Sequence, residues 1–103
     1  MASIAQTWAE HLAREEIAYQ VDGDGNAVFP PRVGPYEWRV SNGTGTVYAT
    51  TTIRRRGEEP YDVSLIDLDE GFRIMSRVRD GGEIGTRVKV YFEDGVPLFE
   101  AAA

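Results

Sequence analysis

The hydrophobic pattern of this chain changes its period near Trp38, and the change predicts the fold class. From there apolar and polar residues alternate, so that in Arg87–Phe92 Val88, Val90 and Phe92 alternate with Arg, Lys and Tyr. Successive side chains of a strand point to opposite faces, so this alternation indicates half-buried β-strands. The expected strands are Glu37–Ser41, Thr46–Arg54, Asp62–Leu68, Phe72–Val78, Arg87–Phe92 and Pro97–Phe99. Short strands with tight turns predict a mainly β fold with a small closed or partly closed barrel.

A helical pattern precedes the strands. Ser3 can cap a helix that runs to about Glu16, and Ile4, Trp8 and Leu12 recur at four-residue steps along one face. This face either covers one end of the core or binds a partner, for which an exposed Trp is a suitable anchor.

Residues 22–35 are rich in Asp, Gly, Asn and Pro, which favour turns over regular structure. We therefore expect an irregular connector with at most two short strands. Asp22, Asp24 and Asn26 alternate as in a calcium loop, but no Glu follows at the closing position. We divide the chain into residues 1–36, the helix and connector, and residues 37–103, the barrel. The two parts are expected to form one structural unit.

Composition limits the possible functions. The 103 residues fit one domain, and a net charge of −6 opposes general binding to nucleic acid. The absence of cysteine excludes disulfides, thiolate catalysis and cysteine-based metal sites, and a single histidine excludes an all-histidine cluster. Without a long apolar run or a basic leader, a cytoplasmic protein that is not anchored in a membrane is expected.

Few residues suggest catalysis. His11 has no evident nucleophile or carboxylate partner, and Asp67, Asp69 and Glu70 cluster at what is expected to be a hairpin tip. We therefore expect a protein that is not itself an enzyme and binds no metal or cofactor alone.

Two polar segments carry alternative interpretations. Arg54, Arg55 and Arg56 lie in the loop between the first two long strands, which borders the ligand face in OB-folds. They either hold a phosphate or an acidic partner, or form a solvated loop that the following Glu58 and Glu59 neutralise. The Asn42-Gly43-Thr44-Gly45 segment either binds an anion or marks a barrel corner, and glycines in strands favour the corner.

Several short motifs occur in a fixed order along almost the whole chain. They are Trp8 in a helix, Phe29-Pro30-Pro31-Arg32, Glu37-Trp38, Gly43-Thr44-Gly45-Thr46-Val47-Tyr48, Pro60-Tyr61, Glu70-Gly71, Ile84-Gly85 and Pro97-Leu98-Phe99. This order resembles the acyl-CoA-associated OB-fold family known as domain of unknown function 35.

The resemblance implies an N-terminal helix, a zinc ribbon and a five-stranded OB-fold barrel. It also implies an accessory subunit that completes a thiolase-superfamily enzyme (a thiolase, a thiolase-like aldolase or an acyltransferase) in lipid or steroid degradation. A partner of the hot-dog-fold hydratase class is the related alternative. An OB module for single-stranded nucleic acid is another, with Tyr48, Tyr61, Phe72 and Tyr91 as stacking residues.

The chain departs from this family in the ribbon. The cysteine pairs of the family fall on Val21 and Asp24 and near Gly34-Pro35-Tyr36. One Asp and three residues that are not ligands cannot replace four thiolates, so we expect no zinc and a degenerate ribbon held by packing or by the partner.

The resemblance also suggests contact residues. Arg32, Arg54, Arg55 and Arg56 are candidates for contact with a CoA phosphate of the acyl-CoA or with the partner enzyme. The interface candidates are Trp8, Leu12, Phe29, Pro30, Pro31, Arg32, Tyr48 and Tyr61. For the Phe29–Arg32 segment, a structural role in tying the connector to the barrel is equally expected.

Overall fold

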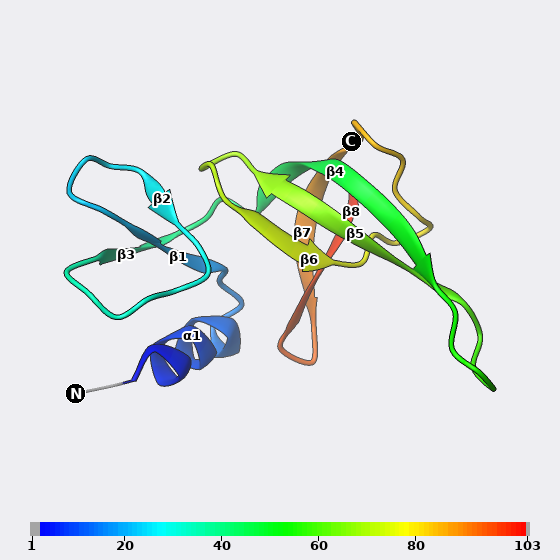
Figure 1. Cartoon of the computed structure of the whole chain (residues 1–103), viewed down its shortest axis with the longest axis horizontal. Coiled ribbons are helices and arrows are strands. Elements are labelled where there is room, and N and C mark those ends of the chain that lie inside the picture. Colours follow the sequence, from blue (N-terminus) through cyan, green and yellow to red (C-terminus); the bar gives the residue numbers. More distant parts are fainter. Residues whose placement is uncertain (1–2, 103) are drawn as a thin grey trace.

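The computed structural model describes residues 3–102, which form one helix followed by two antiparallel sheets (Figure 1). The smaller sheet has the order β2-β1-β3 and the larger one β6-β5-β4-β7-β8. The elements are α1 (Ile4–Ala13), β1 (Ala18–Val21), β2 (Ala27–Val28), β3 (Glu37–Val40), β4 (Thr44–Ile53), β5 (Tyr61–Leu68), β6 (Arg73–Ser76), β7 (Arg87–Glu93) and β8 (Val96–Ala101). We call α1 with β1–β3 the ribbon unit and β4–β8 the barrel.

Helix α1 begins at a capping box. The Ser3 hydroxyl accepts a hydrogen bond from the Gln6 N–H, and the Gln6 side chain accepts one from the Ser3 N–H. The helix ends earlier than the expected Glu16, because Glu15 adopts the left-handed conformation with φ 60°. Within residues 3–102 no helix has the length and apolarity needed to span a membrane.

The two outermost strands of the larger sheet, β6 and β8, meet and close the barrel. Beyond β6, Val78 pairs with Phe99 of β8 in parallel. The Phe99 N–H donates to the Arg77 carbonyl at 2.9 Å, and the Arg79 N–H donates to the Phe99 carbonyl at 2.7 Å. The predicted mainly β fold with a five-stranded OB-fold barrel is therefore confirmed.

The chain approaches its neighbours closely at two glycines, Gly43 just before β4 and Gly45 within it. A Cβ on Gly45 would collide with the main chain of Asp67 in β5, and one on Gly43, at φ 74°, would collide with the Val90 side chain. These contacts favour the interpretation of the Gly43–Gly45 segment as a barrel corner.

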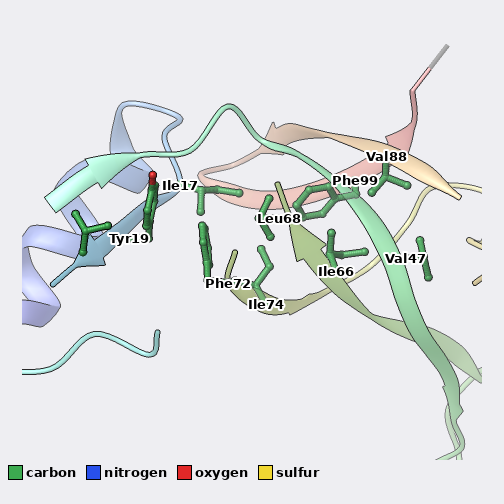
Figure 2. Packing of buried hydrophobic residues seen from close by; sticks show 10 residues of the cluster. Ile17, Tyr19, Val47, Ile66, Leu68, Phe72, Ile74, Val88 and Phe99 are labelled. Carbon is green, nitrogen blue, oxygen red and sulfur yellow. The ribbon is translucent and has the colours of Figure 1, made fainter. Parts of the chain in front are cut away.

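One continuous hydrophobic core joins the ribbon unit to the barrel (Figure 2). Tyr19 of β1 stacks on Phe72, with ring centroids 4.8 Å apart. From Phe72 the buried side chains continue into the barrel interior as Leu68, Ile74, Phe99, Ile66, Val47 and Val88. The ribbon unit is therefore packed against the barrel wall near the β5–β6 turn.

The smaller sheet differs from the sequence expectation. Strand β1 was not predicted, because all four of its residues are buried and show no alternation. Strand β3 was expected at about its observed position but grouped with the barrel, whereas it pairs with β1 from Ala18↔Val40 to Val21↔Glu37. The division of the chain at residue 36 stays a prediction.

Candidate functional site

The residues proposed for binding lie at opposite ends of the molecule. Trp8, Leu12 and the Phe29–Arg32 segment belong to the ribbon unit, whereas Arg54–Arg56 form the tip of the β4–β5 hairpin that projects from the other end of the barrel (Figure 1). The molecule measures 42 Å along its longest axis. These residues therefore form two separate candidate surfaces.

At the first surface, aromatic side chains connect α1 to the barrel. The ring centroids of Trp8 and Phe29 lie 5.7 Å apart, and those of Phe29 and Phe72 lie 5.2 Å apart. Trp8, Leu12 and Phe29 are only partly exposed, and Phe29 packs on the core. The structural interpretation of Phe29 is therefore favoured, and Pro30 remains as an exposed neighbour.

The main chain of Arg32 is held by a buried amide. Gln20, 2% exposed, donates from Nε2 to the Arg32 carbonyl at 2.9 Å and accepts from the Arg32 N–H at 2.7 Å. The exposed Arg32 borders a hollow of about 450 Å³ between α1 and the ribbon loop. Apolar side chains of the same hollow are Ile4, Val33, Tyr36 and Trp38. Sequence reasoning missed Gln20, whose neighbours gave no signal.

The residues at the positions where the resemblance places the family's cysteines do not fit zinc. Val21 is a buried core residue, and the N–H of Asp24 donates to Oδ1 of Asp22 in a tight turn. The turn N–H groups, first that of Asn26, lower the pKa of Asp22. Among residues 3–102 no three His, Cys, Asp or Glu side chains come together as a ligand set. Packing and turn hydrogen bonds hold the chain at Val21 and Asp24.

The second surface carries the arginine triplet. Arg54, Arg55 and Arg56 are all exposed in the loop between β4 and β5. Among the ion pairs formed within residues 3–102, none includes the triplet or the neighbouring Glu58 and Glu59. The triplet is therefore available to an anion or an acidic surface.

Three arginines that sequence reasoning missed lie over three tyrosines of the barrel, of which Tyr48 is exposed and Tyr61 and Tyr91 are partly exposed. The guanidinium carbon of Arg73 lies 3.5 Å from the Tyr48 ring centroid, that of Arg77 5.1 Å from Tyr61, and that of Arg79 4.2 Å from Tyr91. The spacing of these arginines along β6 and its continuation was the available signal. Phe72, the fourth expected stacking residue, is 5% exposed and belongs to the core, so this part of the nucleic-acid hypothesis is wrong.

The groups considered for catalysis are engaged in structural contacts. His11 Nδ1 and Glu16 Oε1 lie 2.9 Å apart, and this hydrogen bond is the main cause that lowers the pKa of Glu16. Asp69 accepts two hydrogen bonds from Arg87, at 2.7 and 2.8 Å, which lower the pKa of Asp69. Asp67 is likewise paired with Arg73, and Glu70 accepts from the Ser41 hydroxyl and the Asn42 N–H.

A polar hollow of about 630 Å³ lies between the β4–β5 hairpin and the loop that follows β6. Its lining includes Thr50, Thr52 and Asp62 of the hairpin and Asp80 and Glu83 of the loop. Thr52 donates to Asp62 at 2.8 Å, so these side chains hold one another across the hairpin. The surface is hydroxylic and acidic, which disfavours a phosphate inside this hollow.

A helix, a small three-stranded sheet and a closed five-stranded barrel define an OB-fold protein with an N-terminal extension. A family model described as "ChsH2, C-terminal OB-fold domain" matches residues 38–93, which is more than half of the chain. The chain therefore belongs to this family, and the predicted resemblance is confirmed.

A solved structure titled "Ltp2-ChsH2(DUF35) aldolase" contains a chain of the same fold. It matches with a TM-score of 0.80 and 22% sequence identity, covering 100% of this chain and 98% of that one. The ribbon unit and the barrel are therefore both included in the likeness. Curated proteins gave no match.

Proposed function

We propose that this protein is a non-catalytic accessory subunit that binds and completes a thiolase-superfamily enzyme acting on acyl-CoA thioesters. The observation that carries the proposal is the end-to-end likeness to a chain in the structure titled as an Ltp2–ChsH2(DUF35) aldolase. A barrel alone would match many OB-folds, whereas this likeness extends through the helix and the degenerate ribbon. Degradation of lipid or steroid side chains is the corresponding process.

The chemistry of the side chains supports a subunit without its own catalysis. General acid–base work needs a group that is free to exchange a proton with the substrate. The imidazole of His11 and the carboxylates of Asp67, Asp69 and Glu70 are instead occupied in structural contacts. The proposal therefore assigns the reacting groups to the partner.

The two surfaces suit different contacts. The ribbon surface offers partly exposed aromatic and apolar groups around Trp8 and Val33, as interface centres do. The hairpin tip offers charge from Arg54–Arg56 and suits a CoA phosphate or an acidic face. Arg32 belongs to the loop between β2 and β3, which lies at the other end of the molecule from the β4–β5 hairpin tip, so it cannot hold the same phosphate as the triplet and is assigned to the partner (Figure 1).

The proposal is tested by co-expressing the chain with the thiolase-like protein that we expect to be encoded beside it and analysing the mixture by size-exclusion chromatography. We expect one heteromeric peak. Trp8→Ala should weaken the complex by about 2 kcal/mol or more if Trp8 is an anchor. Because Trp8 also packs on Phe29, Val33→Asp provides a change on a side chain that is 91% exposed and need not disturb folding.

Glu10→Ala, an exposed change on α1, is the matched control and should leave the complex intact. Separate elution of the two wild-type proteins at micromolar concentration would contradict the proposal. An intact complex with both Trp8→Ala and Val33→Asp would remove the ribbon unit from the interface.

A further inference from the structure

The C-terminal part of β4, residues 48–53, has an open edge. β4 pairs with β7 only over Thr44–Thr46, and Val47 then exchanges hydrogen bonds with the loop residues Gly85 and Thr86. From Tyr48 to Ile53, within the described part of the chain, β4 pairs with β5 alone. Figure 1 shows this hairpin extending past the other strands. Such an edge presents main-chain N–H and C=O groups that can pair with another strand.

The sequence of this edge does not protect it. Natural edge strands are commonly blocked by Pro, Lys or other charges, or by a bulge. Residues 48–53 read Tyr-Ala-Thr-Thr-Thr-Ile, with no proline and no charge, and are rich in residues of high β-propensity. The bulge lies between Val47 and Ala49, where the open edge begins, so most of the edge is regular.

The two faces beside the edge differ in polarity. On the outer face, Ala49, Val63, Leu65 and Met75 line an apolar hollow of about 200 Å³, and Met75 is 70% exposed. On the other face lies the polar hollow of about 630 Å³. An added strand places alternate side chains on the two faces, so this edge suits a segment with alternating apolar and polar residues.

The charge beside the open edge indicates that the added strand is acidic. The open edge leads directly into Arg54–Arg56, which are exposed and form no ion pair within residues 3–102. In a chain of net charge −6 this concentration of positive charge favours an acidic segment. Glu58 and Glu59 follow in the same loop and reduce this preference without cancelling it, since three cations face two anions.

We propose that residues 48–53 of β4 are a docking edge to which an extended acidic segment of the partner enzyme adds as a further strand. Its apolar side chains lie on the Met75 face, and its acidic end meets Arg54–Arg56. This inference rests on the proposed function and specifies one contact of the complex. It places the arginine triplet against protein rather than against a CoA phosphate.

Hydrogen–deuterium exchange tests the docking edge in the free chain and in the complex with the co-expressed thiolase-like protein. In the free chain, the amides of residues 48–53 that face away from β5 should exchange fast. In the complex they should become at least about tenfold slower, because the new ladder protects them. A stable complex in which these amides stay unprotected overturns the docking edge and leaves the accessory function standing.

If no complex forms, the accessory function and the docking edge fall together. Slow exchange of these amides in the free chain, with the mass of a dimer by light scattering, means that a second copy occupies the edge and also overturns the inference.

A variant pair tests the charge. Replacing Arg54, Arg55 and Arg56 by Ala should weaken the complex about tenfold at low salt and less at high salt, as expected for three exposed charge contacts. The matched control replaces Glu58 and Glu59 by Gln in the same loop and should not weaken it. Unchanged affinity of the triple variant at low salt, or equal loss in both variants, contradicts the acidic occupant. A loss of free acyl-CoA binding in the triple variant, with partner affinity unchanged, assigns the triplet to phosphate instead.

Discussion

The five strands of the barrel close on themselves through main-chain hydrogen bonds, whereas the three strands of the ribbon unit form a small sheet of two- to four-residue strands that contacts the barrel through side chains. Tyr19 and Phe29 reach Phe72 at the barrel wall, and Gln20 holds the main chain of Arg32. The main-chain closure of the barrel therefore does not involve the ribbon unit, whereas the two share one hydrophobic core.

The difference bears on how the ribbon unit can be ordered if it binds no zinc, as the absence of cysteine predicts. In the family that the sequence resembles, zinc would fix the ribbon loops. Here a buried Val21 fills one of the cysteine positions, and the Asp22 turn orders the loop beside it. Burial of apolar surface in the shared core orders these residues, so the ribbon unit is stabilised by its contact with the barrel.

The largest expected effect comes from the shared residue. Phe72→Ala should lower the free energy of unfolding by about 3–5 kcal/mol, because it leaves a cavity between Tyr19 and Phe29. Urea unfolding measures the loss. Tyr91→Ala, an aromatic truncation on the barrel away from the ribbon unit, is the control and should cost less. A loss of unfolding free energy below about 1 kcal/mol for Phe72→Ala would contradict the view that the contact at Phe72 stabilises the ribbon unit on the barrel.

A smaller effect is expected inside the barrel. Gly45→Ala should destabilise the protein by about 1–3 kcal/mol, since the new methyl group collides with the main chain of β5. Gly23→Ala, at a position with open space and no unusual φ, should be nearly neutral. Equal thermal midpoints for the two variants would show that the β4–β5 crossing is loosely packed.

Acid should act on both regions modestly. The pKa of Asp22 in the ribbon unit and that of Asp69 in the barrel are lowered, by turn N–H groups and by Arg87 respectively. A carboxylate with a lowered pKa in the folded state stabilises the fold above its ordinary pKa, and this stabilisation is lost as pH falls through the lowered value. We therefore expect the urea concentration at the unfolding midpoint to decrease once the pH is lowered below about 4.

Asp22→Asn and Asp69→Asn should each have a shallower decrease in urea midpoint between pH 7 and pH 3 than the wild-type protein. An unchanged pH dependence in Asp69→Asn would show that the ion pair with Arg87 does not contribute to stability.

The smallest expected effect is that of a chelator. Because no three His, Cys, Asp or Glu side chains cluster within residues 3–102, incubation with EDTA should leave the thermal midpoint unchanged, and elemental analysis should find no bound zinc. About one zinc per chain that resists the chelator would contradict the prediction that the ribbon unit binds no zinc.

The sequence predicted the barrel better than the ribbon unit, for physical reasons. Period-two alternation is clear in the sequence of Arg87–Phe92, where Val88 is buried between the exposed Arg87 and Lys89. It is absent in β1, which is buried on both faces and follows the helix after a short turn. The pairing of β3 with β1 depends on contacts at long range that no local pattern records.

The candidate site was predicted in part. The exposed triplet Arg54–Arg56 could be found from charge alone. The inward packing of Phe29 and the hydrogen bonds between Gln20 and Arg32 could not, because both depend on the tertiary fold. The open edge of β4 likewise follows from where β7 ends its pairing, which is a property of the closed barrel.

The central claim is that this chain supplies no chemistry but completes a thiolase-like enzyme. It is tested most directly by measuring acyl-CoA turnover with the thiolase-like protein alone, with this chain alone, and with the two mixed at equal concentration. We expect no turnover by this chain and a large gain on mixing, which Trp8→Ala reduces and Glu10→Ala does not. Turnover by the chain alone, or equal activity of the partner with and without the chain, would contradict the claim.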